Sequence, residues 1–443
     1  MPAPVSPAVH SATEVATGST RGTAPPSEGG ESPTARGAAG RYPGLDWLRA
    51  LASILVVILH AGIPYMTSPM PGLIWCTEDR PSRTPVINAL GWGIDTFVMP
   101  LFFLIGGFLA CQSCGKGGPW TFFKNRTARL GLPFLVAFVL IMPADLYVWL
   151  LGWVCEDRII PRKMRSLKFD GDLGAQLMGP GHLWFLQSMW LFCAGAALLA
   201  HLWNRRAARS ASSESPATIP FPRPTASHAA RLAAVVSLFL VSVAGLYWKP
   251  LVVIGFQQAI LPQLPNILYY APCFALGWCL QHWQWKPARP WGPTLLALSL
   301  ATFPVVYQSI ARHVVTPLAG LDRLQLVGAF TFCGWLAAAG LFAWALRSSR
   351  AAPKWIDYLS RASLWIYLAH HPIVALTQIS LRLTPGSGIW KCAAATAAGL
   401  AFCLLTYEAA IRGRWLDTLL NGAKPLSKPQ SVPPVPLPAA RVA

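Results

Sequence analysis

Ten stretches of about 20 mostly apolar residues recur along the chain, and this pattern restricts its fold more than any other feature. Over the whole chain 54% of the residues are hydrophobic and only 12% are charged, against roughly 25% charged residues in an ordinary soluble domain. Apolar segments of this length can satisfy their backbone hydrogen bonds in lipid as helices. We therefore predict an all-α, polytopic membrane helix bundle with about ten transmembrane helices. The predicted spans are 47–66, 92–114, 130–152, 183–203, 231–248, 266–283, 291–311, 326–346, 363–381 and 389–411.

The formal net charge of +19 would be compatible with a nucleic-acid partner. However, the basic residues are spread singly over the segments between apolar stretches, whereas a nucleic-acid surface concentrates them in one patch. We therefore expect no nucleic acid and interpret the charge as a topology signal. Loops on the side of the membrane that holds the N-terminus carry roughly twice as many Lys and Arg residues as the loops on the other side. This asymmetry predicts that both termini are cytoplasmic.

Three segments have the composition of solvated spacers. Residues 1–41 are rich in Ser, Thr, Gly, Pro and Ala, and no apolar core precedes Tyr42. We expect a disordered cytoplasmic tail there and no cleavable signal peptide. A flexible cytoplasmic loop is expected at 204–230, and a proline-rich cytoplasmic tail at 416–443. The predicted transmembrane domain is residues 42–415.

The first apolar stretch holds two ionisable residues, which are costly in a bilayer and therefore indicate function. Arg49 and His60 are eleven positions apart, so they share one helix face about 16 Å apart along the axis. The alternative interpretation is structural: Arg49 extends to the interface and pairs with Asp46, while His60 bonds to a neighbouring helix.

The second stretch contains Asp95 at a depth similar to that of His60. An aspartate that accepts from one imidazole nitrogen leaves the other nitrogen as a general base, which suits deprotonation of a hydroxyl group. We therefore predict His60 and Asp95 as a catalytic pair. The alternative is that Asp95 caps a helix at the interface.

Arg126 and Arg129 lie three positions apart before the third stretch, on the same side as Arg49. Two guanidinium groups on one helix face suit a diphosphate, which each can bind through two hydrogen bonds. The alternative is that they anchor the helix at the cytoplasmic surface.

The ten cysteines do not predict a metal site. Cys111 and Cys114 stand without a second pair or a histidine pair at zinc-finger spacing. Cys76 and Cys155 both fall in predicted outer loops, where a disulfide is permitted. The sequence leaves open whether these two are bridged.

Four motifs follow one another along the chain. They are Leu-Asp-Trp-Leu-Arg49 with His60; Gly-Ile-Asp95 with the Arg126-x-x-Arg129 pair; Gly181-His182-Leu-Trp184-Phe185-Leu; and Ser363-Leu-Trp-Ile-Tyr367-Leu-Ala-His370-His371-Pro372. Together they resemble the membrane acyltransferase-3 proteins, and the resemblance spans about 42–415. The histidine-rich details are most similar to the glucan-succinylating branch of that family.

The resemblance implies an O-acyltransferase of the bacterial inner membrane. Such an enzyme takes an acetyl- or succinyl-type group from cytoplasmic acyl-CoA and delivers it to a hydroxyl of a glucan or another glycan outside. Acyl-CoA is then a co-substrate, and no permanently bound cofactor is expected. By the same resemblance His60 is the essential histidine, and the arginines Arg49, Arg126 and Arg129 contact the anionic end of the donor. The substrate-binding positions are His182, Trp184, Tyr367 and His370.

The chain departs from the family pattern at two points. It has Gly106 where the family often has Ser, and we interpret the Gly106-Gly107 pair as close helix packing. His371 leaves open which histidine of the His370-His371 pair faces the site. The alternative function is a transporter or flippase of a glycan or an anionic lipid-linked substrate, since intramembrane Arg, Asp and His also line transport paths.

Overall fold

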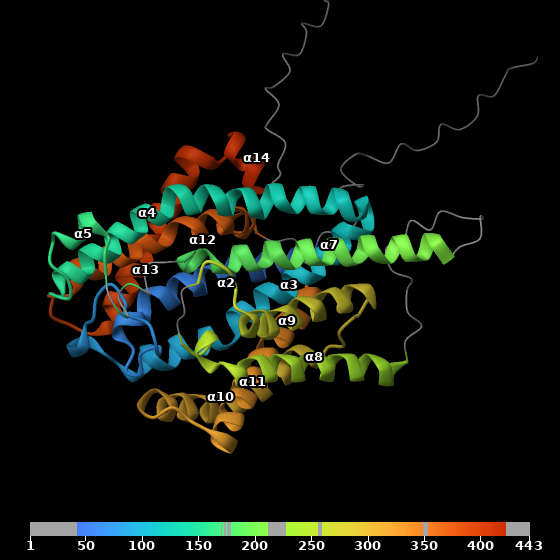
Figure 1. Ribbon diagram of the computed structural model, residues 1–443, viewed down its shortest axis with the longest axis horizontal. Coiled ribbons are helices and arrows are strands. Elements are labelled where there is room, and N and C mark those ends of the chain that lie inside the picture. The colour runs from blue at the N-terminus through green and yellow to red at the C-terminus, as the bar shows by residue number, and fades with distance from the viewer. Residues whose placement is uncertain are drawn as a thin grey trace, which may run out of the picture. The chain divides into compact units, whose positions relative to one another are not determined.

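The computed structural model describes residues 42–421, with gaps at 170, 172–173, 175–178, 211–226, 256–258 and 349–352. The tail expected at 1–41 and most of the tail expected at 416–443 lie outside the described residues. Within these ranges the chain is helical and forms no strand (Figure 1). The short helix α14, Trp415–Asn421, lies at the start of the expected C-terminal tail.

Each of the ten predicted stretches overlaps one long helix in the described part of the chain. These helices are α2 (Pro43–Gly62), α3 (Pro85–Arg126), α4 (Leu132–Cys155), α7 (Trp184–Ser210), α8 (His228–Trp248), α9 (Leu264–His282), α10 (Trp291–Val315), α11 (Gly320–Arg347), α12 (Lys354–Leu381) and α13 (Gly388–Thr406).

Seven helical runs in the described residues are long and apolar enough to cross a membrane. One of them, Pro85–Cys155, contains both α3 and α4, while α9 and α12 are not among the seven. The all-helical, membrane-type fold is therefore confirmed. The number of ten spans and the cytoplasmic location of the termini remain predictions.

Local sequence signals explain where several helices begin. Pro43 occupies the first turn of α2, where its missing N–H costs nothing. Three other helices are capped by a hydroxyl that accepts a backbone N–H of the first turn: Thr84 before α3, Ser227 before α8 and Ser387 before α13. Helix α7 extends to Ser210, so the first residues of the expected loop 204–230 are helical.

The core is formed where α2 packs against α3, α11, α12 and α13, with α4 lying against the other side of α12 (Figure 1). Small residues allow α3 and α9 to approach closely. A β-carbon on Gly107 would lie 1.9 Å from the carbonyl oxygen of Phe274, and one on Gly277 would lie 2.0 Å from that of Leu104. A β-carbon on Gly106 would meet Met189 at 2.3 Å. The interpretation of the glycine pair as close helix packing is confirmed.

A loop of residues 66–84 connects the end of α2 to the start of α3. The buried Lys391 of α13 stabilises this loop. Its Nζ donates to Asp79 Oδ2 at 2.5 Å and to Ser82 Oγ at 2.9 Å. The hydroxyl of Thr77 also donates to Glu156 Oε1 at 2.6 Å. These contacts hold the loop, and with it Trp75, over the end of α2.

Candidate active site

His60 projects from α2 toward α12, where its polar partner is another histidine. Its Nδ1 lies 2.8 Å from Nε2 of His370, and the two rings are within 11° of parallel. His60 also contacts His371, at 5.1 Å between ring centroids. The imidazole therefore faces the interior of the bundle.

Backbone carbonyls fix which nitrogens of this histidine pair bear hydrogen. His370 Nδ1 lies 2.8 Å from the carbonyl oxygen of Ile366 and 3.1 Å from that of Tyr367. A carbonyl can only accept, so Nδ1 of His370 carries a hydrogen and its Nε2, in the neutral ring, accepts one from His60 Nδ1. The lone pair of His60 is then on Nε2, as a general base requires.

Gln378 of α12 and Trp75 of the 66–84 loop hold His60 in place. The amide of Gln378 donates to the carbonyls of His60 at 2.9 Å and Ala61 at 3.0 Å, and its oxygen accepts from Trp75 Nε1 at 2.8 Å. The Trp75 ring stacks on His60 at 6.1 Å between centroids. Sequence reasoning missed both roles because a loop tryptophan and a helical glutamine carry no motif of their own.

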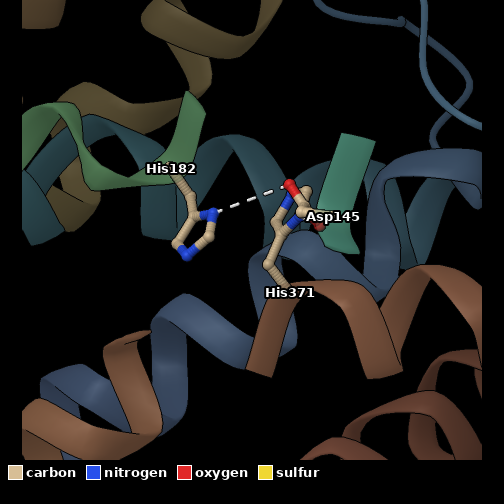
Figure 2. Close-up of side chains that lie close together, drawn as sticks. All are labelled: Asp145, His182 and His371. Carbon is tan, nitrogen blue, oxygen red and sulfur yellow. Dashed lines mark hydrogen bonds and ion pairs between the residues drawn. The ribbon is translucent and has the colours of Figure 1, made fainter. Parts of the chain in front are cut away.

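A second polar cluster, which we call the Asp145 cluster, consists of Asp145 on α4, His182 beside the start of α7 and His371 on α12 (Figure 2). His371 Nδ1 lies 2.7 Å from Asp145 Oδ1, and His182 Nδ1 lies 3.9 Å from Asp145 Oδ2. All three side chains are at most 5% exposed. The pair His370-His371 thus serves both clusters, because one ring faces His60 and the other faces Asp145.

Pro372 explains how His182 is oriented. A proline within α12 removes the N–H that would bond to the carbonyl of Leu368, four residues earlier. His182 Nε2 donates to that carbonyl at 3.1 Å instead. The hydroxyl of Tyr367 donates to the backbone carbonyl of His182. Tyr367 therefore fixes the segment that carries His182.

Asp95 is not the partner of His60. No hydrogen bond or ion pair joins them in the described residues, and Oδ2 of Asp95 is buried without a hydrogen-bond partner. Asp95 lies within electrostatic range of Tyr269 and Tyr270 on α9, whereas His60 faces α12. The expected His60–Asp95 contact is absent because the two side chains point toward different helices.

Trp184 and the other tryptophans near the site pack against the core of the bundle. Trp184 contacts Tyr270 at 5.1 Å between ring centroids. Trp149 stacks on His371 at 5.5 Å, and Trp153 is fully buried with its Nε1 donating to the carbonyl of Trp75. Trp184 is therefore half-buried and packs against the aromatic core, and its assignment to substrate binding remains a prediction.

The cysteines form no disulfide. All ten are free thiols, so Cys76 and Cys155 are not bridged. Burial raises the pKa of the Cys76 thiol well above its ordinary value. Cys76 is therefore a neutral thiol and not a nucleophilic thiolate.

A basic pocket of about 260 Å³ lies where α3 ends and α4 begins. The chain kinks at Gly118, whose φ of +76° is accessible to glycine, and then passes through a π-helical turn at Thr127–Gly131. This path places two predicted donor-binding arginines at one opening. The pocket is lined by Ser113, Lys116, Gly117, Thr121, Phe122, Asn125, Arg126 and Arg129.

The guanidinium of Arg126 is held in place by hydrogen bonds, and no carboxylate of the described residues pairs with it. It donates to the carbonyl of Leu109 at 3.2 Å and to Ser113 Oγ at 3.0 Å. Arg49 lies 4.0 Å from Asp46 and 3.4 Å from Ser363 Oγ, and it is close enough to Arg126 for the two charges to repel each other. An anion bound between them would relieve that repulsion.

Comparison with known proteins decides the family. The sequence profile of the acyltransferase-3 family, described as an acyltransferase domain, matches residues 42–408. The chain belongs to this acyltransferase family. It is therefore an acyltransferase with the membrane-type helical fold of that family, as the four motifs predicted.

Individual relatives are more distant. The chain is 23% identical over 406 residues to glucans biosynthesis protein C of Salmonella heidelberg and to that of Salmonella paratyphi A, which covers 87% of this chain and 95% of each relative. It is also 25% identical over 163 residues to an amino-acid racemase of Enterococcus faecalis, but that match covers 36% of this chain and 18% of the racemase. No solved structure matches the chain.

Proposed function

We propose that this acyltransferase moves an acetyl- or succinyl-type group from cytoplasmic acyl-CoA to a hydroxyl of a glucan or another glycan on the outer side of a bacterial inner membrane. The observation that carries the proposal is the His60–His370 hydrogen bond, which leaves His60 Nε2 with its lone pair. Full-length similarity to glucans biosynthesis protein C supports a glucan as the acceptor.

The basic pocket supports an acyl-CoA donor. Lys116, Arg126 and Arg129 supply three cationic side chains around one opening, and Arg49 adds a fourth nearby. Bidentate arginine contacts suit the diphosphate of coenzyme A. Because Arg49 and His60 are on the same helix about 16 Å apart, an extended pantetheine arm can connect the two regions.

The reaction proceeds by proton transfer to His60. Nε2 takes the proton of the acceptor hydroxyl while its oxygen attacks the thioester carbonyl. The resulting tetrahedral intermediate collapses with cleavage of the C–S bond. The departing thiolate takes the proton from His60, so ester and coenzyme A thiol are the products. The low polarity of the surrounding core strengthens these interactions.

Mass spectrometry of the acceptor tests the proposal. Purified protein in lipid nanodiscs is incubated with acetyl- or succinyl-CoA and a glucan oligosaccharide. We expect the glucan to gain the mass of one acyl group with the wild type and with His201→Ala, which alters an exposed histidine of α7. His60→Ala should form product at least 100-fold more slowly, at about a hundredth of the wild-type rate or less. If neither the glucan nor any of a range of other glycans is acylated, the assigned acceptor class is contradicted.

The structure is compatible with direct transfer and with an acyl-histidine intermediate at His60. Incubation with radiolabelled acyl-CoA alone distinguishes them. Label that stays on the wild-type protein and is lost in His60→Ala indicates the covalent route. Absence of label on wild-type protein that is active with acceptor indicates direct transfer.

A further inference from the structure

When His182 is neutral, the Asp145 cluster contains two electron-pair donors that face each other. Because His182 Nε2 donates to the carbonyl of Leu368, Nδ1 of the neutral ring carries the lone pair. This Nδ1 is buried without a hydrogen-bond partner and lies 3.9 Å from Asp145 Oδ2. Figure 2 shows the two groups directed toward each other. The arrangement becomes favourable when a positive charge lies between them, either a proton on Nδ1 or a metal ion.

The charge of Asp145 leads to the same requirement. Its carboxylate side chain is only 5% exposed, and its partners in the described residues are the two histidines, with no Arg or Lys. An isolated buried carboxylate is strongly unfavourable unless a positive charge lies beside it. The charge must therefore come from a proton on a histidine or from a bound cation.

We propose that Asp145, His182 and His371 bind a divalent transition-metal ion of the Zn²⁺ or Co²⁺ type. The ligand atoms of the three residues all lie within 4.8 Å of one another. Two imidazoles and a carboxylate form a donor set that suits Zn²⁺, and three protein ligands are the number found in zinc sites that keep a fourth position open. An oxygen of water or of substrate fits that position.

Small movements suffice to form the site. Metal–ligand distances of about 2.0–2.2 Å separate tetrahedral ligands by roughly 3.3 Å. The His371–Asp145 contact of 2.7 Å must therefore open slightly, and the His182–Asp145 distance of 3.9 Å must shorten. The hydrogen on His371 Nδ1 must move to Nε2 of the same ring, which frees Nδ1 for the metal without a net release of a proton.

The surroundings of His182 match those of metal-binding histidines. Such histidines typically donate their other N–H to a carbonyl or carboxylate, which fixes the tautomer and the ring orientation. His182 does so through the Leu368 carbonyl that Pro372 leaves unbonded. The cluster also adjoins His60, because the His60 and His371 rings are 5.1 Å apart between centroids. The proposed metal site is thus adjacent to the proposed base.

The metal content of the purified protein tests the proposal independently of acyl-transfer activity. The protein is purified through a tag that contains no histidine run, and metals are measured by inductively coupled plasma mass spectrometry. The chelator-treated protein is then titrated with Zn²⁺ by calorimetry and with Co²⁺ by absorbance. We expect about one equivalent per chain, with affinity weakened roughly 10-fold or more in Asp145→Asn and in His182→Gln. His370→Gln, which alters a neighbouring ring outside the cluster, should keep it.

Two further measurements keep the result interpretable. Size-exclusion profiles and thermal unfolding identify a variant that fails to fold, and Asp145→Glu then serves as the conservative variant that should retain binding. The Co²⁺ spectrum reports the ligands: visible bands without a thiolate charge-transfer band are expected. Absence of binding to the wild type, equal affinity in Asp145→Asn, or a thiolate band from the free cysteines would each overturn the proposal.

Discussion

The hydrogen bond from His60 Nδ1 to His370 Nε2, 2.8 Å long, defines the first prediction. In His370→Leu the buried Nδ1–H of His60 loses its acceptor. Leaving a buried donor unsatisfied costs about 1–3 kcal/mol. If the catalytic orientation of the His60 ring becomes less favourable by this amount, kcat drops by roughly 5- to 150-fold, since each 1.36 kcal/mol is a factor of ten. The apparent KM for acyl-CoA should change little, because the basic pocket is untouched.

The assay is initial-rate acyl transfer in nanodiscs, with acyl-CoA and acceptor varied separately. His370→Gln provides the matched control, because its amide oxygen can accept from Nδ1, and its kcat should lie closer to that of the wild type. A His370→Leu variant with wild-type kcat would refute the positioning role. So would a loss confined to KM for acyl-CoA.

Three shorter predictions follow from other parts of the molecule. Arg126→Ala should raise KM for acyl-CoA by roughly 10-fold or more through lost charge-assisted hydrogen bonds, while Arg205→Ala on α7 should not, as steady-state kinetics will show. Lys391→Met leaves the buried Asp79 unpaired and should cost about 3–5 kcal/mol, visible as a lower thermal unfolding midpoint; an unchanged midpoint would contradict this. The pKa of Glu78 lies below its ordinary value: partial burial acts to raise it, but hydrogen bonds and charges from nearby arginines outweigh burial. Its stabilisation is therefore complete above the ordinary pKa and is lost as pH falls through the lowered one. In Glu78→Gln the thermal unfolding midpoint should fall less as the pH decreases. A variant whose midpoint depends on pH as that of the wild type does would contradict this prediction.

The helices themselves were predictable from the sequence. An apolar run of about 20 residues has few alternatives to a helix, and every predicted run falls on one. Close packing of α3 was equally readable, because Gly106 and Gly107 are adjacent small residues in an apolar segment. The ends of the helices were less predictable. Helix α7 continues to Ser210, beyond the apolar run that ends at residue 203, because polar and basic residues can also form helical turns outside the lipid.

The site was predictable in its residues but only partly in its contacts. His60 stood out because an imidazole is rare in an apolar stretch, and the family resemblance singled out His182 and His370. Which carboxylate meets a histidine depends on how each helix is rotated against its neighbours. Depth alone favoured Asp95, whereas helix packing places Asp145 at the histidines. The sequence motifs also give no indication that Pro372 frees a carbonyl for His182, which is a three-dimensional consequence.

The central claim is that His60 is the base for acyl transfer, and chemical rescue tests it most directly. The rate of product formation is measured for His60→Ala with and without added imidazole. We expect the variant to lose about 10²- to 10⁴-fold in rate and to recover part of it with imidazole, while Arg126→Ala shows no such recovery. A His60→Ala enzyme that transfers acyl groups at the wild-type rate would contradict the account.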